Sequence, residues 1–193
     1  GLNPFMTVDS AGGVHVVWQS ADDVLAYSYR DPGGKWLQEE VARSPRAWAV
    51  IADQNVEVVG GVVWVSAVIA TDTGRGWGWG LWRRMGPGQW ERVETPLASR
   101  HLASVRVVPV GDLWFVTYMI WEERIGGWRH RLLWGFWREG GWVEAGTLAV
   151  YVDREPVLFP PACTMGACWG VWTVDEGAGL DQQYEVWIRE IRR

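Results

Sequence analysis

The sequence predicts an all-β fold, a β-propeller with four blades of about four antiparallel strands each. A glycine followed by an apolar segment recurs at intervals of 48, 50 and 55 residues, at Gly13, Gly61, Gly111 and Gly166. Between these glycines the chain consists of short runs of β-branched and aromatic residues, separated by Gly, Pro and Asp turns. No stretch of a dozen residues has the period of a helix. Four strands in a repeat of roughly 40–50 residues are typical of a propeller blade.

Two further landmarks keep the same order in the repeats. A strand that ends in arginine recurs at Arg30, Arg83, Arg138 and Arg189. A glycine turn that leads into tryptophan recurs at Trp36, Trp90 and Trp142. At the third position after the repeat glycines stand Val16, Trp64, Trp114 and Trp169. We expect the last three of these to fill the core between blades and the turn tryptophans to anchor their hairpins.

The length of 193 residues suits a single domain that spans residues 1–193. Its hydrophobic content of 48% is enough for a sizeable core. The landmarks place the blades at about residues 5–45, 47–97, 102–149 and 150–193. The last repeat lacks an outer strand after Ile191, and the apolar residues 2–8 are expected to supply it, which would remove an open edge.

Part of the first repeat resembles a known motif. The segment Asp31-Pro32-Gly33-Gly34-Lys35-Trp36, preceded by Tyr29, keeps the Asp-x-Gly-x-x-Trp spacing of the Asp-box, the bacterial neuraminidase repeat of sialidase-like propellers. Tyr29 and Lys35 stand where that motif has Ser or Thr. The resemblance covers about 35 residues well and implies a structural hairpin turn on the rim away from the catalytic face. It therefore bears on the fold more than on chemistry.

Composition and motifs exclude several function classes. The net charge of −5 argues against nucleic acid as a partner, and no apolar run reaches the roughly 20 residues of a membrane span. His15, His101 and His130 are too scattered for a metal motif, and no cofactor-binding or nucleophile motif is present. Most carboxylates stand in Gly-rich turns, where Asp bonds its own backbone, so no catalytic residue is selected. We therefore expect no catalytic residues, no metal and no cofactor.

The two cysteines, Cys163 and Cys168, flank what reads as a short hairpin turn. They either form a disulfide or remain two buried thiols that act as small apolar residues. A bridge would indicate an oxidising compartment and favour an extracellular or cell-surface location.

The 17 tryptophans are the most informative feature for function. In Gly76-Trp77-Gly78-Trp79-Gly80 the alternation of a strand places two indoles on one face, with Trp82 close by and Arg75 and Arg83 at the flanks. A sugar ring stacks on such a face while an arginine fork binds its hydroxyls or a carboxylate. The ligand-binding residues predicted from the sequence are Trp77, Trp79, Trp82, Arg75 and Arg83. The alternative is that these rings fill the space between blades.

Three function classes follow from these observations. The first is a carbohydrate-binding, lectin-like propeller whose partner is a glycan or other polysaccharide. The second is a structural or protein-binding propeller that assembles into homo-oligomers. The third is a sialidase-like enzyme, or a fragment of one. The surplus of tryptophan favours the first class over the second, and the lack of an identifiable catalytic set places the enzyme last.

Overall fold

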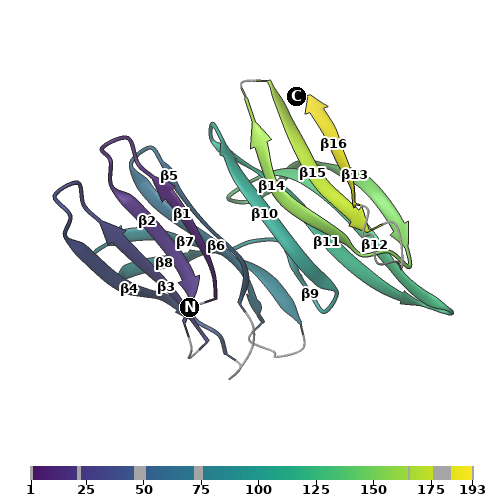
Figure 1. The fold of residues 1–193 in the computed structure, drawn as a ribbon, viewed down its shortest axis with the longest axis horizontal. Coiled ribbons are helices and arrows are strands. Elements are labelled where there is room, and N and C mark those ends of the chain that lie inside the picture. The colour runs from purple at the N-terminus through teal and green to yellow at the C-terminus, as the bar shows by residue number, and fades with distance from the viewer. Residues whose placement is uncertain are drawn as a thin grey trace. The chain divides into compact units, whose positions relative to one another are not determined.

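The computed structural model describes residues 2–20, 23–45, 51–71, 76–164, 166–175 and 184–192. Within these ranges every regular element is a β-strand, and the strands form four antiparallel sheets (Figure 1). The chain divides into two compact units, Gly1–Arg100 and His101–Arg193, with two sheets in each. The predicted fold class, an all-β propeller of four blades, is confirmed, and each sheet corresponds to one blade.

The first sheet has its strands in chain order. It consists of β1 (Leu2–Val8), β2 (Val14–Gln19), β3 (Val24–Arg30) and β4 (Trp36–Arg43). Aspartate closes two of its hairpins. Asp9 Oδ1 accepts hydrogen bonds of 2.8 Å from the backbone nitrogens of Ala11 and Gly13, and Asp31 Oδ1 accepts one of 2.8 Å from the backbone nitrogen of Lys35. The segment that resembles an Asp-box is thus the turn between β3 and β4.

The second sheet completes the first unit. It consists of β5 (Ala52–Val59), β6 (Val62–Ala70), β7 (Trp77–Gly86), β8 (Gln89–Val93) and the short β9 (Ala98–Ser99), which pairs with β7. The turn between β5 and β6 is Gly60-Gly61, with φ of 58° and 79°. Positive φ at both positions is the conformation of the tight hairpin turn that glycine favours.

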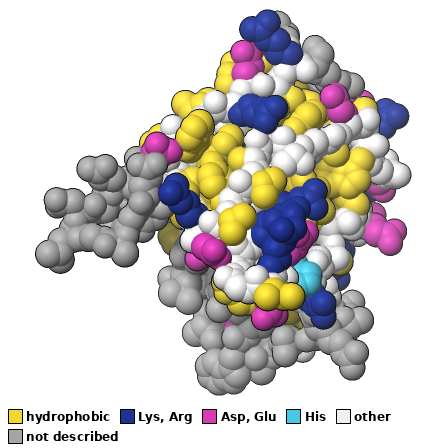
Figure 2. Space-filling model, turned by 90° about the vertical axis from the view of Figure 1, so that its right-hand side faces the viewer, with side chains coloured by type: hydrophobic (Ala, Val, Ile, Leu, Met, Phe, Trp, Pro, Cys, Tyr) yellow, Lys and Arg dark blue, Asp and Glu magenta, His cyan; other side chains and the backbone are white. Residues whose placement is uncertain are grey.

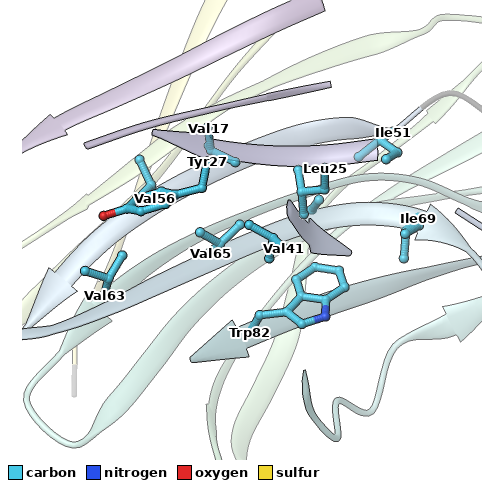
Figure 3. Close-up of a cluster of buried hydrophobic side chains, with 11 residues drawn as sticks. Val17, Leu25, Tyr27, Val41, Ile51, Val56, Val63, Val65, Ile69 and Trp82 are labelled. Carbon is cyan, nitrogen blue, oxygen red and sulfur yellow. The ribbon is translucent and has the colours of Figure 1, made fainter. Parts of the chain in front are cut away.

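The core of the first unit lies between its two sheets. The alternation of β2 turns Val17 inward, and the facing side chains of both sheets meet over it (Figure 3). The buried side chains include Val17, Leu25 and Tyr27 of the first sheet and Val56, Val65 and Trp82 of the second. Two sheets that bury their apolar faces on each other form one cooperative core.

The second unit repeats this arrangement. The third sheet consists of β10 (Leu102–Val110), β11 (Leu113–Arg124), β12 (Gly127–Arg138) and β13 (Gly141–Val152). The fourth sheet consists of β14 (Pro156–Cys163), β15 (Ala167–Asp175) and β16 (Tyr184–Arg192). The core includes Phe115 and Phe136 of the third sheet and Trp172 of the fourth. β11 and β12 are 12 residues long and form a long hairpin.

The structure places residues 2–8 differently from the sequence prediction. They form β1, whose register partners run from Leu2 opposite Gln19 to Val8 opposite Val14, all in β2. The expectation that they supply the outer strand of the last blade is corrected: they are the first strand of the first sheet. The short turn after Val8 explains this, because strands joined by a short turn pair with each other. In the described part of the chain the fourth sheet has three strands.

The repeat tryptophans differ in burial. Trp114 is buried as expected, but Trp64 and Trp169 are only half-buried. Arg83 lies over the Trp64 ring, with its Cζ atom 5.8 Å from the ring centroid. Of the turn tryptophans, Trp36 is exposed. The repeat position therefore sets the strand register and does not by itself decide which indole is buried.

Candidate functional site

The tryptophans of the predicted site lie on β7. Trp77 and Trp79 share one face of the strand, as the alternation requires, and Trp82 points to the opposite face. Trp82 belongs to the core between the two sheets of the first unit and is 4% exposed. Trp79 is 1% exposed, and Trp77 is half-buried. The three indoles therefore do not form one exposed platform, and only Trp77 offers part of its surface to solvent.

The arginines of the predicted site are in different situations. Arg75 lies outside the described residues. Arg83 donates from Nε and Nη2 to Oε2 of Glu91, at 3.0 and 2.6 Å, while it stacks over Trp64. The guanidinium of Arg83 is therefore already hydrogen-bonded to the carboxylate of Glu91 on the adjacent strand β8.

The glycines between these tryptophans have a packing role. A Cβ atom on Gly80 would overlap the buried Trp82 ring, and one on Gly76 would lie 2.8 Å from the backbone nitrogen of Arg100. Gly78 has the Leu97 carbonyl oxygen at 3.4 Å from the same hypothetical atom. The glycines let the ring of Trp82 and the segment around β9 approach β7 closely, which explains the motif without a ligand.

This packing role gives a prediction. We expect Gly80→Ala to lower the free energy of unfolding by about 1–3 kcal/mol, because the Trp82 ring must leave its position. The control is Gly86→Ala in the same strand, where a Cβ would meet only the Gln89 side chain at 3.6 Å. Urea denaturation of both variants provides the comparison, and equal stability of the two would contradict the packing role.

A pocket of about 420 Å³ lies beside Trp79. Its lining includes Thr71, Gly78, Trp79, Arg92, Glu94 and Thr95. The Thr95 hydroxyl donates to the Trp79 carbonyl oxygen, and the Trp79 amide donates to the Leu97 carbonyl oxygen at 2.8 Å. The segment after β8 thus covers Trp79, which is 1% exposed although it is part of the pocket lining.

The third sheet carries a second group of aromatic side chains, which we call the aromatic row. It consists of His101, Trp121, Trp128, His130 and Tyr151. Trp121 lies opposite His130 in the register of β11 and β12, and His130 lies opposite Tyr151 in β13, so these side chains share one face. The Trp121 ring stands edge-on to His101 and to Trp128, with centroid distances of 4.8 and 4.9 Å.

Exposure increases along the aromatic row toward the tip of the long hairpin. Trp128 is 45% exposed, and Trp121 and His130 are half-buried. Tyr151 accepts a hydrogen bond of 2.7 Å from Nε1 of the buried Trp172. The row therefore has a fixed inner end in the core of the second unit and an open indole at its outer end.

The charges near the aromatic row are separated by face. Glu123 lies opposite Trp128 and shares its face, and Asp153 Oδ1 accepts a hydrogen bond of 2.9 Å from the Trp128 amide. Arg129 and Arg131 lie on the other face, at 3.5 and 3.6 Å from the oxygens of Glu122. On the face of the row Glu123 thus places a carboxylate, which accepts hydrogen bonds, beside Trp128.

The sequence alone did not single out Trp121 and Trp128 as neighbours. The signal was available in the hairpin itself. The two-residue turn Ile125-Gly126 joins β11 to β12 and sets Glu123 opposite Trp128. That register alone places Trp121 and Trp128 on one face.

A separate polar network lies in the first unit. His15 contacts Asp9 Oδ2 through Nε2 at 3.0 Å and the Tyr27 hydroxyl through Nδ1 at 2.7 Å. The hydrogen bond with His15 lowers the pKa of Asp9, and burial raises the pKa of Tyr27. Tyr27 is fully buried and His15 is 3% exposed. His15 and Tyr27 are therefore closed to a ligand, and their hydrogen bonds satisfy polar atoms within the sheet packing.

The two cysteines form a disulfide, so the structure has the first of the two alternatives. Cys163 and Cys168 lie opposite each other in the hairpin of β14 and β15. They line a pocket of about 580 Å³ together with Phe136, Asp112 and Thr164. No cluster of His, Cys, Asp and Glu able to hold a metal ion occurs among the described residues. The described part of the chain also has no helix with the length and hydropathy to cross a membrane.

Comparison with known proteins gives likeness of fold only. No protein-family model matches the chain, and no curated protein matches it in sequence. Among solved structures, the phage phi92 endosialidase aligns with a TM-score of 0.67 and 10% identity over 98% of this chain and 35% of its own. The Bacteroides ovatus xyloglucan PUL GH43B aligns with a TM-score of 0.60 and 10% identity, over 96% of this chain and 38% of its own.

A third similar structure is the Bombyx mori GH32 beta-fructofuranosidase BmSUC1, with a TM-score of 0.55 and 14% identity over 96% of this chain and 45% of its own. The chain spans less than half the length of each of these three structures. All three are propellers of glycosidase or sialidase type.

Proposed function

We propose that this chain is a glycan-binding propeller and that the aromatic row of the third sheet is its sugar-binding surface. The observation that carries the proposal is the pair of Trp121 and Trp128, edge to face at 4.9 Å, with Trp128 45% exposed near the tip of the hairpin of β11 and β12. An exposed indole held by neighbouring rings is a preorganised platform for the C–H face of a pyranose.

The charges beside the platform favour neutral glycans. Glu123 offers carboxylate oxygens to sugar hydroxyls, whereas an acidic sugar would meet it with like charge. The net charge of −5 adds to this preference. A neutral polysaccharide therefore fits the row better than a sialic-acid polymer.

Three other observations support a glycan partner. The similar structures are described as an endosialidase, a xyloglucan-related GH43 protein and a fructofuranosidase, all of which act on glycans. The partial Asp-box at Asp31 resembles the repeat of sialidase-like propellers. The disulfide is typical of oxidising compartments, where extracellular polysaccharides are found.

The test is affinity electrophoresis against xyloglucan, a fructan and a sialic-acid polymer. We expect a neutral polysaccharide to retard the wild type, and Trp128→Ala and Trp121→Ala each to weaken its binding by about tenfold or more, as for a central aromatic contact. Trp36→Ala is the matched control, because Trp36 is 56% exposed and belongs to the first unit, whereas the row belongs to the second. Trp77→Ala tests the surface that the sequence predicts on β7.

Each other outcome either contradicts part of the proposal or supports another function class. Equal retardation of the wild type and the row variants would contradict the proposed surface. Retardation only by the sialic-acid polymer would contradict the preference for neutral glycans. Release of reducing ends from any of the polysaccharides would support the enzyme alternative, and lack of binding to all of them would support the structural alternative.

A further inference from the structure

The exposed indole of Trp128 depends on its backbone for a fixed position. The Trp121 ring meets it edge-on, and 45% of Trp128 remains open to solvent. Ile125 in the turn of the same hairpin is fully exposed. In Figure 1 the hairpin of β11 and β12 reaches the right-hand side of the molecule, and Figure 2 shows that side, where hydrophobic side chains are exposed between arginine and acidic side chains. On such a surface, the groups that hold the Trp128 backbone decide how well the indole is preorganised.

Asp153 forms hydrogen bonds with both backbone groups of Trp128. The Asp153 amide donates to the Trp128 carbonyl oxygen at 2.9 Å, and Asp153 Oδ1 accepts from the Trp128 amide at 2.9 Å. The regular register of β12 and β13 ends one residue earlier, at Arg129 opposite Val152. In a regular antiparallel pair that exchanges two hydrogen bonds, both acceptors are backbone carbonyl oxygens. Here the Asp153 side chain replaces one of them and extends the pairing to Trp128.

The local backbone explains why the side chain accepts this bond. Asp153 has a φ of 54°, in the left-handed region that Asp and Asn adopt more readily than other residues with a side chain. Gly127 provides the space for the carboxylate, because a Cβ atom on Gly127 would overlap Asp153 Oδ1. The bond to the Trp128 amide therefore requires a left-handed residue with an oxygen acceptor at position 153 and a glycine at position 127.

We propose that Asp153 is a positioning residue of the sugar-binding surface, and that its carboxylate fixes the Trp128 backbone and with it the indole on which the glycan stacks. This inference rests on the proposed function. It separates two exposed carboxylates near Trp128, since Glu123 shares the face of the indole and Asp153 binds the Trp128 backbone. Position 153 needs an oxygen acceptor and a left-handed backbone, and it does not need a negative charge.

The first test compares two substitutions of Asp153 in affinity electrophoresis against xyloglucan and a fructan. Asparagine keeps the Oδ1 acceptor and the left-handed conformation, so we expect Asp153→Asn to bind within about twofold of the wild type. Glycine keeps the conformation but has no acceptor, so we expect Asp153→Gly to bind about three- to tenfold more weakly, the range for a side chain that must be ordered on binding. Asp112→Gly is the control, because it removes an exposed carboxylate from the turn between β10 and β11 of the same sheet.

Gly127→Ala tests the same contact from the other strand. Its Cβ atom would displace the Asp153 carboxylate, so we expect it to weaken binding about as much as Asp153→Gly. In the double variant G127A/D153G the carboxylate is already absent, and the alanine should weaken binding no further. Melting curves of all variants establish that the chain remains folded.

The second test follows the Trp128 amide without a glycan. Hydrogen exchange measured by NMR is expected to be about tenfold faster at this amide in Asp153→Gly than in the wild type or in Asp153→Asn. Exchange at the Arg131 amide in the same strand should not change, whereas a general loss of stability would accelerate both.

The outcomes separate this inference from the proposed function. Equal weakening by Asp153→Asn and Asp153→Gly would assign the effect to the charge of Asp153 and overturn the positioning role. Unchanged affinity and unchanged Trp128 exchange in Asp153→Gly would overturn it as well. A wild type that binds none of the polysaccharides would contradict the proposed function, and the exchange of the Trp128 amide would still decide whether Asp153 fixes the backbone of Trp128.

Discussion

Replacing Trp79 by alanine is expected to lower the free energy of unfolding by about 3–5 kcal/mol, the range for loss of a buried aromatic side chain. Trp79 is 1% exposed and its backbone is bonded to Leu97 and Thr95, so the surrounding residues are held and a cavity remains. For a domain of this size the melting temperature should fall by about 10 °C. Thermal denaturation followed by circular dichroism provides the measurement.

The control for this prediction is Trp36→Ala, which removes an exposed indole from the same unit. Its effect on stability is expected to stay within about 0.5 kcal/mol. If Trp79→Ala melted like Trp36→Ala, Trp79 would not be part of the interior, and a ligand-binding role for it would again be favoured. A loss of glycan binding in Trp79→Ala must be compared with its melting curve, because unfolding of the variant would also abolish binding.

The second large effect is expected for Glu39→Ala. Glu39 is nearly buried, with a side chain that is 3% exposed, and it binds Arg84 through Oε1 at 2.5 Å and through Oε2 at 3.0 Å. Trp90 donates to Oε2 at 3.0 Å. Removal of the carboxylate leaves the half-buried Arg84 guanidinium and Trp90 N–H without this acceptor. The loss of one partner of a fully buried pair costs about 3–5 kcal/mol, and we expect about 2–3 kcal/mol here because the Arg84 side chain is 19% exposed.

Glu40→Ala is the matched control for Glu39→Ala. Glu40 is the next residue in β4 and forms an exposed ion pair with Arg43 at 2.9 Å. Exposed pairs of this kind contribute about 0–1 kcal/mol. Urea denaturation at neutral pH should therefore separate the two alanine variants clearly, and a loss of similar size in both would show that the Glu39 contacts do not stabilise the unit.

The pH dependence of stability provides a further check on Glu39. Burial raises the pKa of Glu39, but the hydrogen bond from Arg84 and further hydrogen bonds outweigh this, so its pKa in the folded chain lies below the ordinary value of 4.5. A carboxyl with a lowered folded pKa contributes stability above its unfolded pKa, and that stability is lost as the pH falls through the folded pKa. We expect the wild type to lose stability below about pH 4.5 more steeply than Glu39→Gln.

The fold was predictable because its signals are local. The repeat glycines mark hairpins, as the Gly60-Gly61 turn with two positive φ angles illustrates, and alternation places Trp77 and Trp79 on one face of β7. The place of residues 2–8 was predicted wrongly because the apolar pattern of a strand does not indicate which other strand it pairs with. The Asp9 turn, which joins these residues to β2, decides the pairing.

The candidate site was harder to predict because it depends on distant parts of the chain. Whether Trp79 is exposed depends on the segment around Leu97, which covers it and could not be placed from the pattern of β7. The aromatic row arises where the registers of β11, β12 and β13 bring Trp121, His130 and Tyr151 together. Alternation gives the face of each side chain, but only the pairing of strands gives its neighbours.

The most direct test of the proposed function is a crystal structure of the protein with the neutral oligosaccharide that binds it best. We expect a sugar ring over the Trp128 indole, with ring atoms within about 4 Å and a hydroxyl toward Glu123. A sugar bound in the pocket beside Trp79, or anywhere else away from Trp121 and Trp128, would contradict it.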